Sequence, residues 1–390
     1  MKVVCIGNSN NLMFSVVRYL RDEGFDAHLI VLGSDNKHFY PECDSFDEKY
    51  KEFTKLVVWG RQYLSSLINR KNIQKDLLEY DYIIACGSGL AYVAKAGLTV
   101  DVFIPFGSDL YLLPYYQWKH PLVMVLCLSF TFFQRKAIRQ AKNILLDIGA
   151  VEMEKSLKRL NYDGNIEFAG VPMLYQPSYN PKNIESYLGK NRFDSVMKQA
   201  RDESDLLVFH HCRHVWKTIS DPVSVKRNDR LICGVSILKQ RTPDKKITLV
   251  LLEYGPDVEA SKALIRELKL EESVIWLPQL ERKEIMTYLY YADVVAGAFN
   301  LSWYSYGVVY EAMVMEKPLL HYREDALYEG MYQSLYPMFS AQGKESIADS
   351  LQQILNDPDK AVAIGKASSD WYEKYVVDNT LRIIKHKLLN

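Results

Sequence analysis

Residues 299–322, FNLSWYSYGVVYEAMVMEKPLLHY, form the most informative stretch of this chain. The stretch predicts a strand end, a loop rich in Ser, Asn and Tyr, a helix that opens at about Tyr306 and Gly307, and a short strand from Pro318. A loop that leads its backbone N–H groups into a helix N-terminus can bind an anion, and Glu311, one turn further in, can hold a hydroxyl of the same ligand. The rest of the chain must distinguish a ligand site from ordinary packing.

Length and composition set the outer limits. At 390 residues the chain is long enough for two domains, each with its own core. Lys and Arg total 48, as do Asp and Glu, so no overall field favours nucleic acid, and we expect no nucleic-acid partner. The six cysteines contain no C-x-x-C pair, which predicts reduced thiols rather than disulfides or structural zinc. The N-terminus lacks the features of a signal peptide, so we expect a cytoplasmic protein.

Alternating strands and helices predict an α/β fold in both halves of the chain. In the first half we expect strands at 2–7, 27–32, 81–86, 100–106, 143–148 and 166–170, and a loop with a surface helix at 35–75. In the second half we expect strands at 206–210, 246–253, 273–278 and 293–298, with helices at 256–268, 282–291, 344–356 and 359–387. The predicted organisation is a Rossmann-like domain over 1–172, a linker region over 173–204, a second Rossmann-like domain over 205–370, and a C-terminal helix over 371–390 that can pack back on the first domain.

Polar residues follow several strands of the first domain. Ligands of such folds bind at the carboxyl ends of the parallel strands. The candidates for binding a second substrate there are Asn8, Asn10, Asn11, Ser88 and Asp109. The Gly-Ser-Asp turn that ends in Asp109 is consistent with a cap or Asx turn and equally with a ligand-binding or catalytic carboxylate. No G-x-G-x-x-G spacing is present, so no dinucleotide cofactor is indicated.

The most apolar window is PLVMVLCLSFTFF at 121–133, which is too short to span a bilayer. Trp118, Lys119 and His120 precede it, and four basic residues follow it by position 142. An apolar helix with such flanks is typical of the surface of an anionic membrane, so peripheral membrane contact through 118–142 is one interpretation. A helix buried between the sheet and a neighbour is the other.

The sequence FHHCRH at 209–214 follows the first strand of the second domain. Arg213 and, 13 residues later, Lys226 then lie near a helix start at Asn228 or Asp229. Two cations beside a helix N-terminus can hold a diphosphate and neutralise its charge as it leaves, so both cations are catalytic candidates. The histidines have no matching ligand pair elsewhere, so we expect no metal and interpret each as a packed or hydrogen-bonded loop residue.

These motifs, together with Glu311-Ala312-Met313 and the Lys317-Pro318 stop, resemble the donor-binding half of GT-B glycosyltransferases of the family-4 type (group 1) over residues 206–320. The resemblance implies two Rossmann-like doubly wound domains facing a central cleft and a nucleotide-sugar that serves as a substrate, without any cofactor. It assigns the donor diphosphate to Arg213 and Lys226 and the ribose hydroxyls to Glu311. Further donor contacts are expected at Gly255, Pro278, Ser305, Tyr306 and Gly307.

One position departs from the family pattern. A second Glu is usual eight residues before Glu311, and here that position is Trp303, followed by Tyr304. Donor-sugar recognition would then fall to an aromatic face or to main-chain groups. The alternative is a catalytically silent GT-B protein that binds nucleotide or sugar or scaffolds other transferases. An epimerase on the same double fold is disfavoured because the paired acidic and His residues it needs are not evident.

The resemblance also implies a retaining transfer in which the leaving diphosphate helps to deprotonate the acceptor. If the enzyme inverts instead, Asp109 is the candidate base. The expected acceptor is a glycan or a polyprenyl-linked glycan, in the assembly of bacterial lipopolysaccharide or capsule at the inner face of the membrane.

Overall fold

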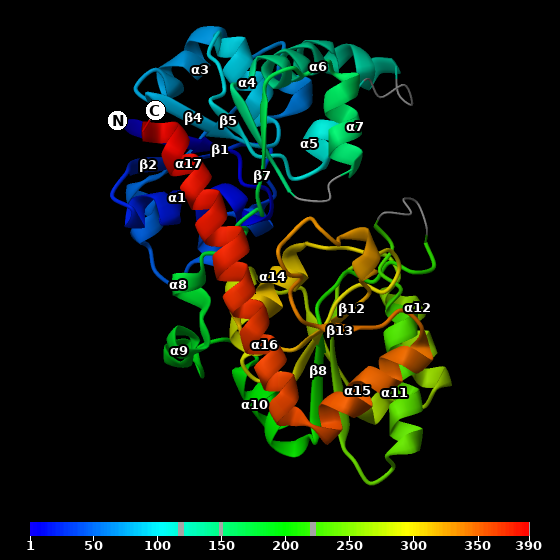
Figure 1. The fold of residues 1–390 in the computed structure, drawn as a ribbon. Helices are drawn as coiled ribbons and strands as arrows, with labels where there is room; N and C mark the ends of the chain where they lie inside the picture. The colour runs from blue at the N-terminus through cyan, green and yellow to red at the C-terminus, as the bar shows by residue number, and fades with distance from the viewer. Residues whose placement is uncertain (116–120, 148–150, 219–223, 390) are drawn as a thin grey trace. The chain divides into compact units, whose positions relative to one another are not determined.

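Figure 1 shows the fold of the computed structural model, which describes residues 1–115, 121–147, 151–218 and 224–389. The chain divides into two compact units. Met1–Tyr175 and Lys374–Asn390 form the first unit, and Gln176–Glu373 form the second. Each unit is built on its own parallel β-sheet, which confirms the predicted α/β fold with two Rossmann-like domains.

Within its described residues the first unit contains a parallel sheet of seven strands in the order β3-β2-β1-β4-β5-β6-β7. The strands are β1 (Lys2–Ile6), β2 (Asp26–Val31), β3 (Thr54–Leu56), β4 (Tyr82–Ala85), β5 (Val102–Phe103), β6 (Asn143–Leu146) and β7 (Asn165–Phe168). The predicted strand at 143–148 therefore ends at Leu146, and Ile148 lies outside the described residues. Strand β3 falls in the segment predicted as loop and surface helix. Its three residues are mostly exposed, so the sequence carries no apolar alternation there.

Helices cover the sheet of the first unit. They are α1 (Leu12–Asp22), α2 (Pro41–Asp44), α3 (Arg70–Leu77), α4 (Gly89–Ala96), α5 (Ser108–Tyr111), α6 (Pro121–Gln140), α7 (Val151–Arg159) and α17 (Asn379–Leu389). Val4 and Ile6 of β1 pack in one core cluster with Leu90 of α4 and with Phe130 and Ile138 of α6. A strand buried in this way is apolar along its whole length, which is why 2–7 was recognisable in the sequence.

The second unit repeats this architecture. Its described residues form a parallel sheet of six strands in the order β10-β9-β8-β11-β12-β13. The strands are β8 (Leu206–His210), β9 (Ile247–Glu253), β10 (Val274–Pro278), β11 (Val294–Ala296), β12 (Leu319–His321) and β13 (Phe339–Ser340). The helices are α8 (Gln176–Tyr179), α9 (Pro181–Ile184), α10 (Asp194–Glu203), α11 (Asn228–Arg241), α12 (Val258–Glu267), α13 (Arg282–Leu289), α14 (Gly307–Val314), α15 (Lys344–Asn356) and α16 (Pro358–Tyr372).

Residues 176–203, which the sequence placed in a linker region, pack within the second unit. Met197 of α10 is buried, and Arg192 forms an ion pair with Glu284 at 2.7 Å. The C-terminal helix α17 belongs to the first unit, where it lies beside α1 in Figure 1. Thr380 donates a hydrogen bond to the carbonyl of Gly170 at 2.6 Å. The chain therefore returns to its first unit after completing the second.

Both sheets share one topological feature. The strand that starts each unit, β1 or β8, lies between the next strand in sequence and a later one, β4 or β11. The connections on the two sides of such a first strand run in opposite directions and leave a crevice at its carboxyl end, where α/β proteins bind ligands. We call this point of each sheet the switch point. The candidate residues follow β1 and β4 in the first unit and β8 and β11 in the second.

Candidate active site

Two helices begin at the carboxyl edge of the second sheet. Helix α11 follows β8 through a loop, and α14 follows β11. The N-cap residues, Arg227 for α11 and Tyr306 for α14, make no side-chain hydrogen bond to the helix start. The first N–H groups of an uncapped helix, with the positive end of its dipole, favour an anion. The second unit therefore carries two such helix starts beside its switch point.

Arg213 and Lys226 lie on two stems of the loop between β8 and α11. The side chain of Arg213 is exposed and forms no ion pair within the described residues. The Lys226 ammonium lies 5.3 Å from the centre of the Tyr306 ring, at the start of α14. Lys226 is fixed by its backbone, since its N–H donates to the Val215 carbonyl at 2.7 Å and its carbonyl accepts from Phe299 N–H at 2.9 Å. The geometry thus joins Lys226 to the loop that follows β11.

Gly255 positions the Arg213 stem. Its φ of +115° is a left-handed value, and a Cβ at this position would lie 2.5 Å from the backbone nitrogen of His214. The two backbones are joined by a hydrogen bond from His214 N–H to the Tyr254 carbonyl at 2.7 Å. Only glycine permits this approach and this backbone conformation together. The predicted donor contact at Gly255 is therefore accompanied by a clear structural role.

The same stem is held by Asp257, which the sequence reasoning missed. Its carboxylate accepts from the N–H groups of Trp216 and Lys217, both at 2.7 Å, and from the N–H and hydroxyl of Thr218, at 3.0 and 2.6 Å. Burial opposes ionisation of Asp257, but these donors from Thr218, Trp216 and Lys217 outweigh it and lower its pKa to about 2. Asp257 is thus a permanent anion that orders the loop. The signal for it was weak, since it is one acidic residue after a Gly-Pro turn.

Glu311 lies inside α14, where it is buried with two partners. Its carboxylate accepts from His211 Nε2 at 2.6 Å and lies 3.4 Å from Arg282 Nε. Arg282 begins α13, and His211 follows β8, so three separate segments meet at this carboxylate. Both partners hold the carboxylate of Glu311 in one orientation, which suits an acceptor for ligand hydroxyls. Arg282 was not predicted, because only tertiary structure brings it to Glu311.

The loop before α14 brings two more predicted residues together. The Tyr306 hydroxyl accepts a hydrogen bond from Ala298 N–H at 2.7 Å, which closes the loop on the end of β11. Gly307 is the first residue of α14, and a Cβ there would lie 3.9 Å from Glu311 Oε1. Ser305 lies between Tyr304 and Tyr306 and is partly buried. Pro278, in contrast, ends β10 at the sheet edge, two strands from β8.

Trp303 and Tyr304 occupy different surroundings. The Tyr304 ring is buried against the rings of Tyr328, Tyr332 and Trp371, with centroid distances of 4.9, 5.0 and 5.7 Å. Its ring therefore stabilises the core of the unit. Trp303 is half-buried, and its indole Nε1 is enclosed without a hydrogen-bond partner among the described residues. Of the two aromatic residues, Trp303 is the candidate for contact with a sugar.

Two histidines of the segment 209–214, His210 and His214, are held neutral. Burial, reinforced by the nearby His214, lowers the pKa of His210 to about 3, and burial lowers the pKa of His214 to about 4. His214 Nδ1 bonds Ser261 Oγ at 2.8 Å, and His210 Nδ1 bonds the Ala296 carbonyl at 2.9 Å. No group of three or more potential metal ligands occurs in the described part of the chain. His214 is thus a packed, hydrogen-bonded loop residue, and His210 is a packed, hydrogen-bonded residue at the end of β8.

In the first unit, Asn8 and Asn11 tie down the loop that follows β1. Asn8 is buried, accepts from Phe14 N–H at 2.9 Å and donates to the carbonyl of Phe39 at 2.5 Å. Asn10 and Asn11 adopt left-handed φ values of 54° and 59°. The Asn11 side chain is buried beside Asn8, whereas the half-buried Asn10 amide makes no side-chain hydrogen bond among the described residues. Asn10 is therefore the member of this group with an amide left for a ligand.

Ser88 and Asp109 follow β4 and β5. Ser88 Oγ lies 2.9 Å from Ser34 Oγ. Asp109 is fully buried, and its carboxylate accepts from the N–H groups of Gly87 and Gly107, at 2.9 and 3.0 Å. Burial raises the pKa of Asp109 to about 7, against the opposing effect of these backbone donors. The contacts match the turn interpretation of Asp109, and its function as a base stays a prediction.

Comparison with known proteins adds to this geometry. HepE (Alr3699) from Anabaena in complex with UDP is similar over 100% of this chain and 99% of its own, with a TM-score of 0.63 and 15% identity. Sucrose-phosphate synthase from Thermosynechococcus elongatus covers the same shares, with a TM-score of 0.59 and 13% identity. UDP-GlcNAc 2-epimerase from Methanocaldococcus jannaschii is similar over 99% of this chain and 100% of its own, with a TM-score of 0.52 and 15% identity. At these identities the likeness establishes the fold.

The fold and the switch-point sites define the class: this is a GT-B protein, as the sequence resemblance predicted. Residues 219–371 match the family model described as glycosyl transferases group 1. The chain therefore carries a group 1 domain and is a glycosyltransferase. A sequence comparison with curated proteins finds no match.

Proposed function

We propose that this enzyme transfers a sugar from a UDP-sugar to a glycan or polyprenyl-linked glycan, with retention of configuration, in the assembly of bacterial surface polysaccharide. The donor site is supported by one observation: Lys226, Glu311 and the starts of α11 and α14 all lie at the carboxyl edge of the second sheet. Lys226 and Arg213 would neutralise the diphosphate, and Glu311 would accept the ribose hydroxyls. The choice of UDP is supported by structural neighbours whose descriptions name UDP.

Retention is supported by the chemistry of the groups at both switch points. The second unit offers cations, helix starts and neutral histidines, and Asp109 in the first unit is enclosed by backbone donors. None of these is an exposed base, whereas cations that stabilise a leaving diphosphate let its oxygen take the proton of the acceptor. Electrostatic stabilisation of the leaving group is then the main contribution of the protein.

A thermal-shift screen with nucleoside diphosphates and sugar nucleotides tests the donor. A ligand at about 100 times its Kd stabilises the native state by about 2.7 kcal/mol, which is easily seen as a higher melting temperature. We expect UDP and at least one UDP-sugar to raise the melting temperature. A response to GDP or ADP alone would contradict the choice of UDP but would still support a nucleotide-binding donor site.

The second candidate is a GT-B protein that binds a sugar nucleotide without transferring the sugar. Trp303 favours it, because this residue replaces the carboxylate expected near the donor sugar. Donor hydrolysis or transfer measured with a panel of UDP-sugars distinguishes the two. Turnover of any donor excludes the silent protein, and tight binding without turnover supports it.

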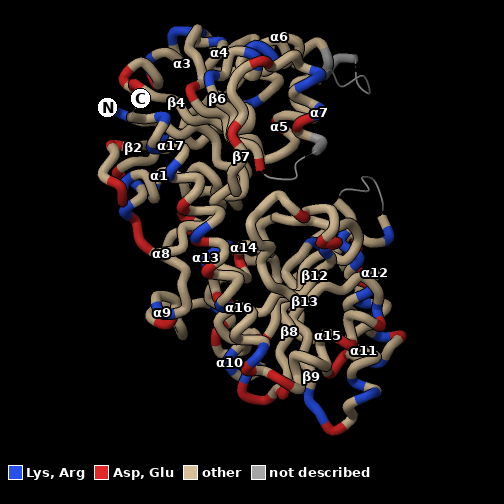
Figure 2. The backbone as a smooth tube through the Cα atoms, viewed as in Figure 1, with Lys and Arg blue, Asp and Glu red and all other residues tan. Residues whose placement is uncertain are grey.

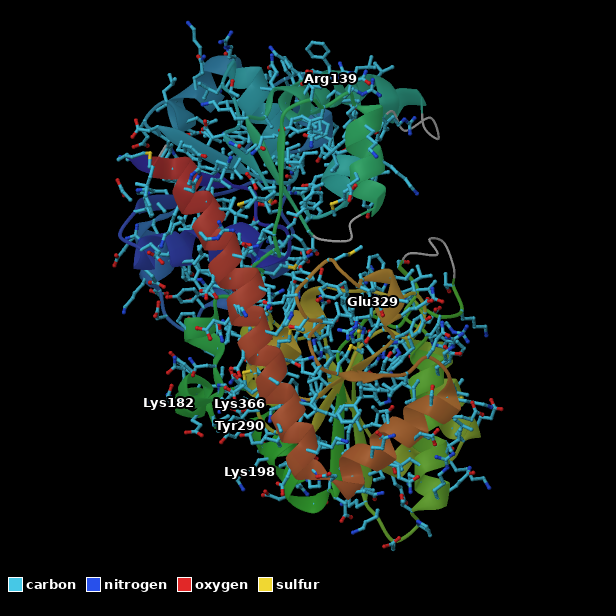
Figure 3. The ribbon with its side chains drawn as sticks, viewed as in Figure 1. Arg139, Lys182, Lys198, Tyr290, Glu329 and Lys366 are labelled. Carbon is cyan, nitrogen blue, oxygen red and sulfur yellow. The ribbon has the colours of Figure 1, made fainter. Side chains whose placement is uncertain are left out.

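The membrane contact rests on α6. One side of this helix packs in the core through Phe130, whereas Val125 and Phe132 are 57% and 60% exposed. Arg139, labelled in Figure 3, lies in the last turn of α6, where its guanidinium donates to the carbonyl of Leu160 at 2.8 Å. The predicted flank of Trp118, Lys119 and His120 lies outside the described residues. No helix in the described part of the chain is long and apolar enough to cross a bilayer.

Sedimentation with anionic liposomes tests this contact. In Figure 2, Lys and Arg are interspersed with Asp and Glu in both units, so binding would depend on the apolar residues as well as on charge. We expect wild-type protein to sediment and Phe132→Ser to remain in the supernatant. Val362→Ser, which changes an equally exposed residue of α16, is the matched control. Failure of the wild type to bind would leave α6 as a packing helix.

A further inference from the structure

Asn228 is a buried residue that joins both stems of the loop between β8 and α11. Its Oδ1 accepts from Val215 N–H at 3.0 Å, and its Nδ2 donates to the Arg213 carbonyl at 3.2 Å. Lys226, two residues before Asn228, is in turn bonded to the carbonyl of Val215. The stem that carries Arg213 and the stem that carries Lys226 are therefore fastened to each other through one amide and one neighbouring backbone group.

This use of Asn228 is unusual for its position. Asparagine near a helix start commonly caps the first N–H groups. Here Asn228 is the first residue of α11, its side chain turns into the loop, and the N-cap residue Arg227 has a left-handed φ of 56° and makes no side-chain cap. The helix start is thus left for another acceptor, while the amide holds the loop.

The orientation of the Asn228 amide is fixed by His210. Nδ2 of Asn228 lies 2.8 Å from His210 Nε2, and His210 Nδ1 lies 2.9 Å from the Ala296 carbonyl. A carbonyl can only accept, so Nδ1 carries the proton, and Nε2 must then accept from the amide. Burial holds His210 neutral by lowering its pKa to about 3, which keeps this tautomer at physiological pH. Hydrogen bonds therefore connect Ala296 of β11 to His210 of β8, His210 to Asn228, and Asn228 to the stem that carries Arg213.

We infer that Asn228 is a positioning residue of the donor site, whose amide sets the spacing of Arg213 and Lys226 and thereby the affinity for the donor diphosphate. The inference rests on the proposed function, because it assumes that these two cations hold the diphosphate. Asn228 itself need not touch the ligand. Its contribution is that two flexible basic side chains start from fixed backbone positions, which lowers the entropy lost when they bind one anion.

The test compares UDP with uridine as probes of full-length wild-type protein and Asn228→Ala by calorimetry. A loop whose stems have separated should weaken UDP binding about tenfold or more, equivalent to the loss of about one or two hydrogen bonds. Uridine lacks the diphosphate, so its affinity should change by less than about twofold. The matched control is Ser204→Ala, which removes a buried 2.6 Å hydrogen bond to Thr248 in the same unit, just before β8 begins. This control should bind UDP as the wild type does.

Two results would overturn the inference: unchanged UDP affinity in Asn228→Ala, or an equal loss for UDP and uridine. If the wild type binds neither UDP nor, in parallel titrations, GDP or ADP, the proposed donor site falls as well. Wild-type binding of UDP with unaltered binding in the variant removes the inference and leaves the proposed function in place.

A second, nearly isosteric variant covers the case in which Asn228→Ala does not fold. In Asn228→Asp the acceptor for Val215 N–H is kept, but the donor to His210 Nε2 becomes an acceptor. A hydrogen bond between this carboxylate and His210 then requires a proton on Nε2 of the His210 ring. The ¹⁵N shifts of the His210 ring, assigned with His210→Gln, should change from the neutral Nδ1–H tautomer to a ring with a protonated Nε2, and UDP binding should weaken about tenfold. An unaltered His210 spectrum or unaltered UDP affinity would refute the positioning network.

Discussion

At the switch point of the first unit, polar side chains that follow β1 and β5 form hydrogen bonds to backbone groups of the same unit, whereas at the switch point of the second unit a cation is exposed to solvent. Asn8 accepts the N–H group of Phe14 in α1, and Asp109 accepts the N–H groups of Gly87 and Gly107, which follow β4 and β5. Arg213 is exposed without an ion pair among the described residues. The same strand order thus supports polar side chains bonded to the backbone in one unit and an exposed cation in the other.

The contrast shows how position and function separate in such folds. A polar residue at the carboxyl end of a strand has two uses: it can satisfy the backbone of a tight loop, or it can be offered to a ligand. Which use applies depends on whether partners within the protein already fill its hydrogen-bonding capacity. In the second unit Asn228, Asp257 and His210 fill the structural role, and Arg213 remains exposed for the diphosphate in our proposal.

The largest expected effect is on transfer by Lys226→Ala. Removing a cation that neutralises the leaving diphosphate should lower kcat/KM by about 10²- to 10³-fold, by analogy with the loss of one preorganised donor. The melting temperature should stay close to that of the wild type, because the backbone bonds of residue 226 survive. Steady-state kinetics with the donor found in the screen, with Lys245→Ala as control, measures it. Full activity of Lys226→Ala would show that Lys226 does not stabilise the leaving diphosphate.

Glu311→Gln should have the next largest effect. A carboxylate that accepts ligand hydroxyls contributes about 1.5–3 kcal/mol per bond, so calorimetry should show uridine binding weakened at least about tenfold. Stability should also fall by about 1–3 kcal/mol, because the buried Arg282 then faces a neutral amide. Glu316→Gln, which alters an exposed residue just after α14, should change neither quantity. Unaltered uridine affinity in Glu311→Gln would contradict the ribose role.

Acidification should move the two units in opposite directions. Burial lowers the pKa of His210, His214 and His321 to about 3, 4 and 3, so the unfolded second unit binds more protons between those values and 6.5 and loses stability as the pH falls below 6.5. Burial raises the pKa of Asp35 and Asp109 to about 6 and 7, so the first unit gains stability as the pH falls from 7 toward the unfolded value of 3.8.

Hydrogen exchange at pH 7 and pH 5.5, corrected for intrinsic rates, measures this divergence. We expect protection to fall in the second unit and to rise in the first, each by on the order of 1 kcal/mol per titrating group and pH unit. Asp109→Asn should remove part of the response of the first unit. A parallel response of both units would show that the buried groups do not govern their acid stability.

The smallest effect is expected from Asn10→Gly in the first unit. Glycine accepts the left-handed φ of 54°, so stability should change by less than about 0.5 kcal/mol while the amide is lost. If Asn10 contacts the acceptor, the KM of Asn10→Gly for the acceptor should rise a few-fold while kcat is retained, as expected for the loss of about one hydrogen bond. Asn161→Gly, with the same φ in the same unit, is the control. An unchanged KM for the acceptor would contradict the contact between the Asn10 amide and the acceptor.

The sequence by itself determined the fold class, most strands and the loops that carry the site. Buried parallel strands are apolar throughout, and the glycines and polar residues that end them are local signals. The same local information located Arg213, Lys226 and Glu311 at strand ends and a helix start. It missed β3 and β13, since strands of three and two residues carry no periodicity.

Only the tertiary structure decided which polar residues serve the protein and which are open to a ligand. His211 meets Glu311 across 100 residues of sequence, Gly87 meets Asp109 across 22, and Asn228 meets His210 across 18. Each of these bonds depends on how helices and strands pack, which no local pattern encodes. The sequence could therefore name the residues at the two switch points, but the hydrogen bonds that occupy Asp109 and leave Arg213 exposed exist only in the folded chain.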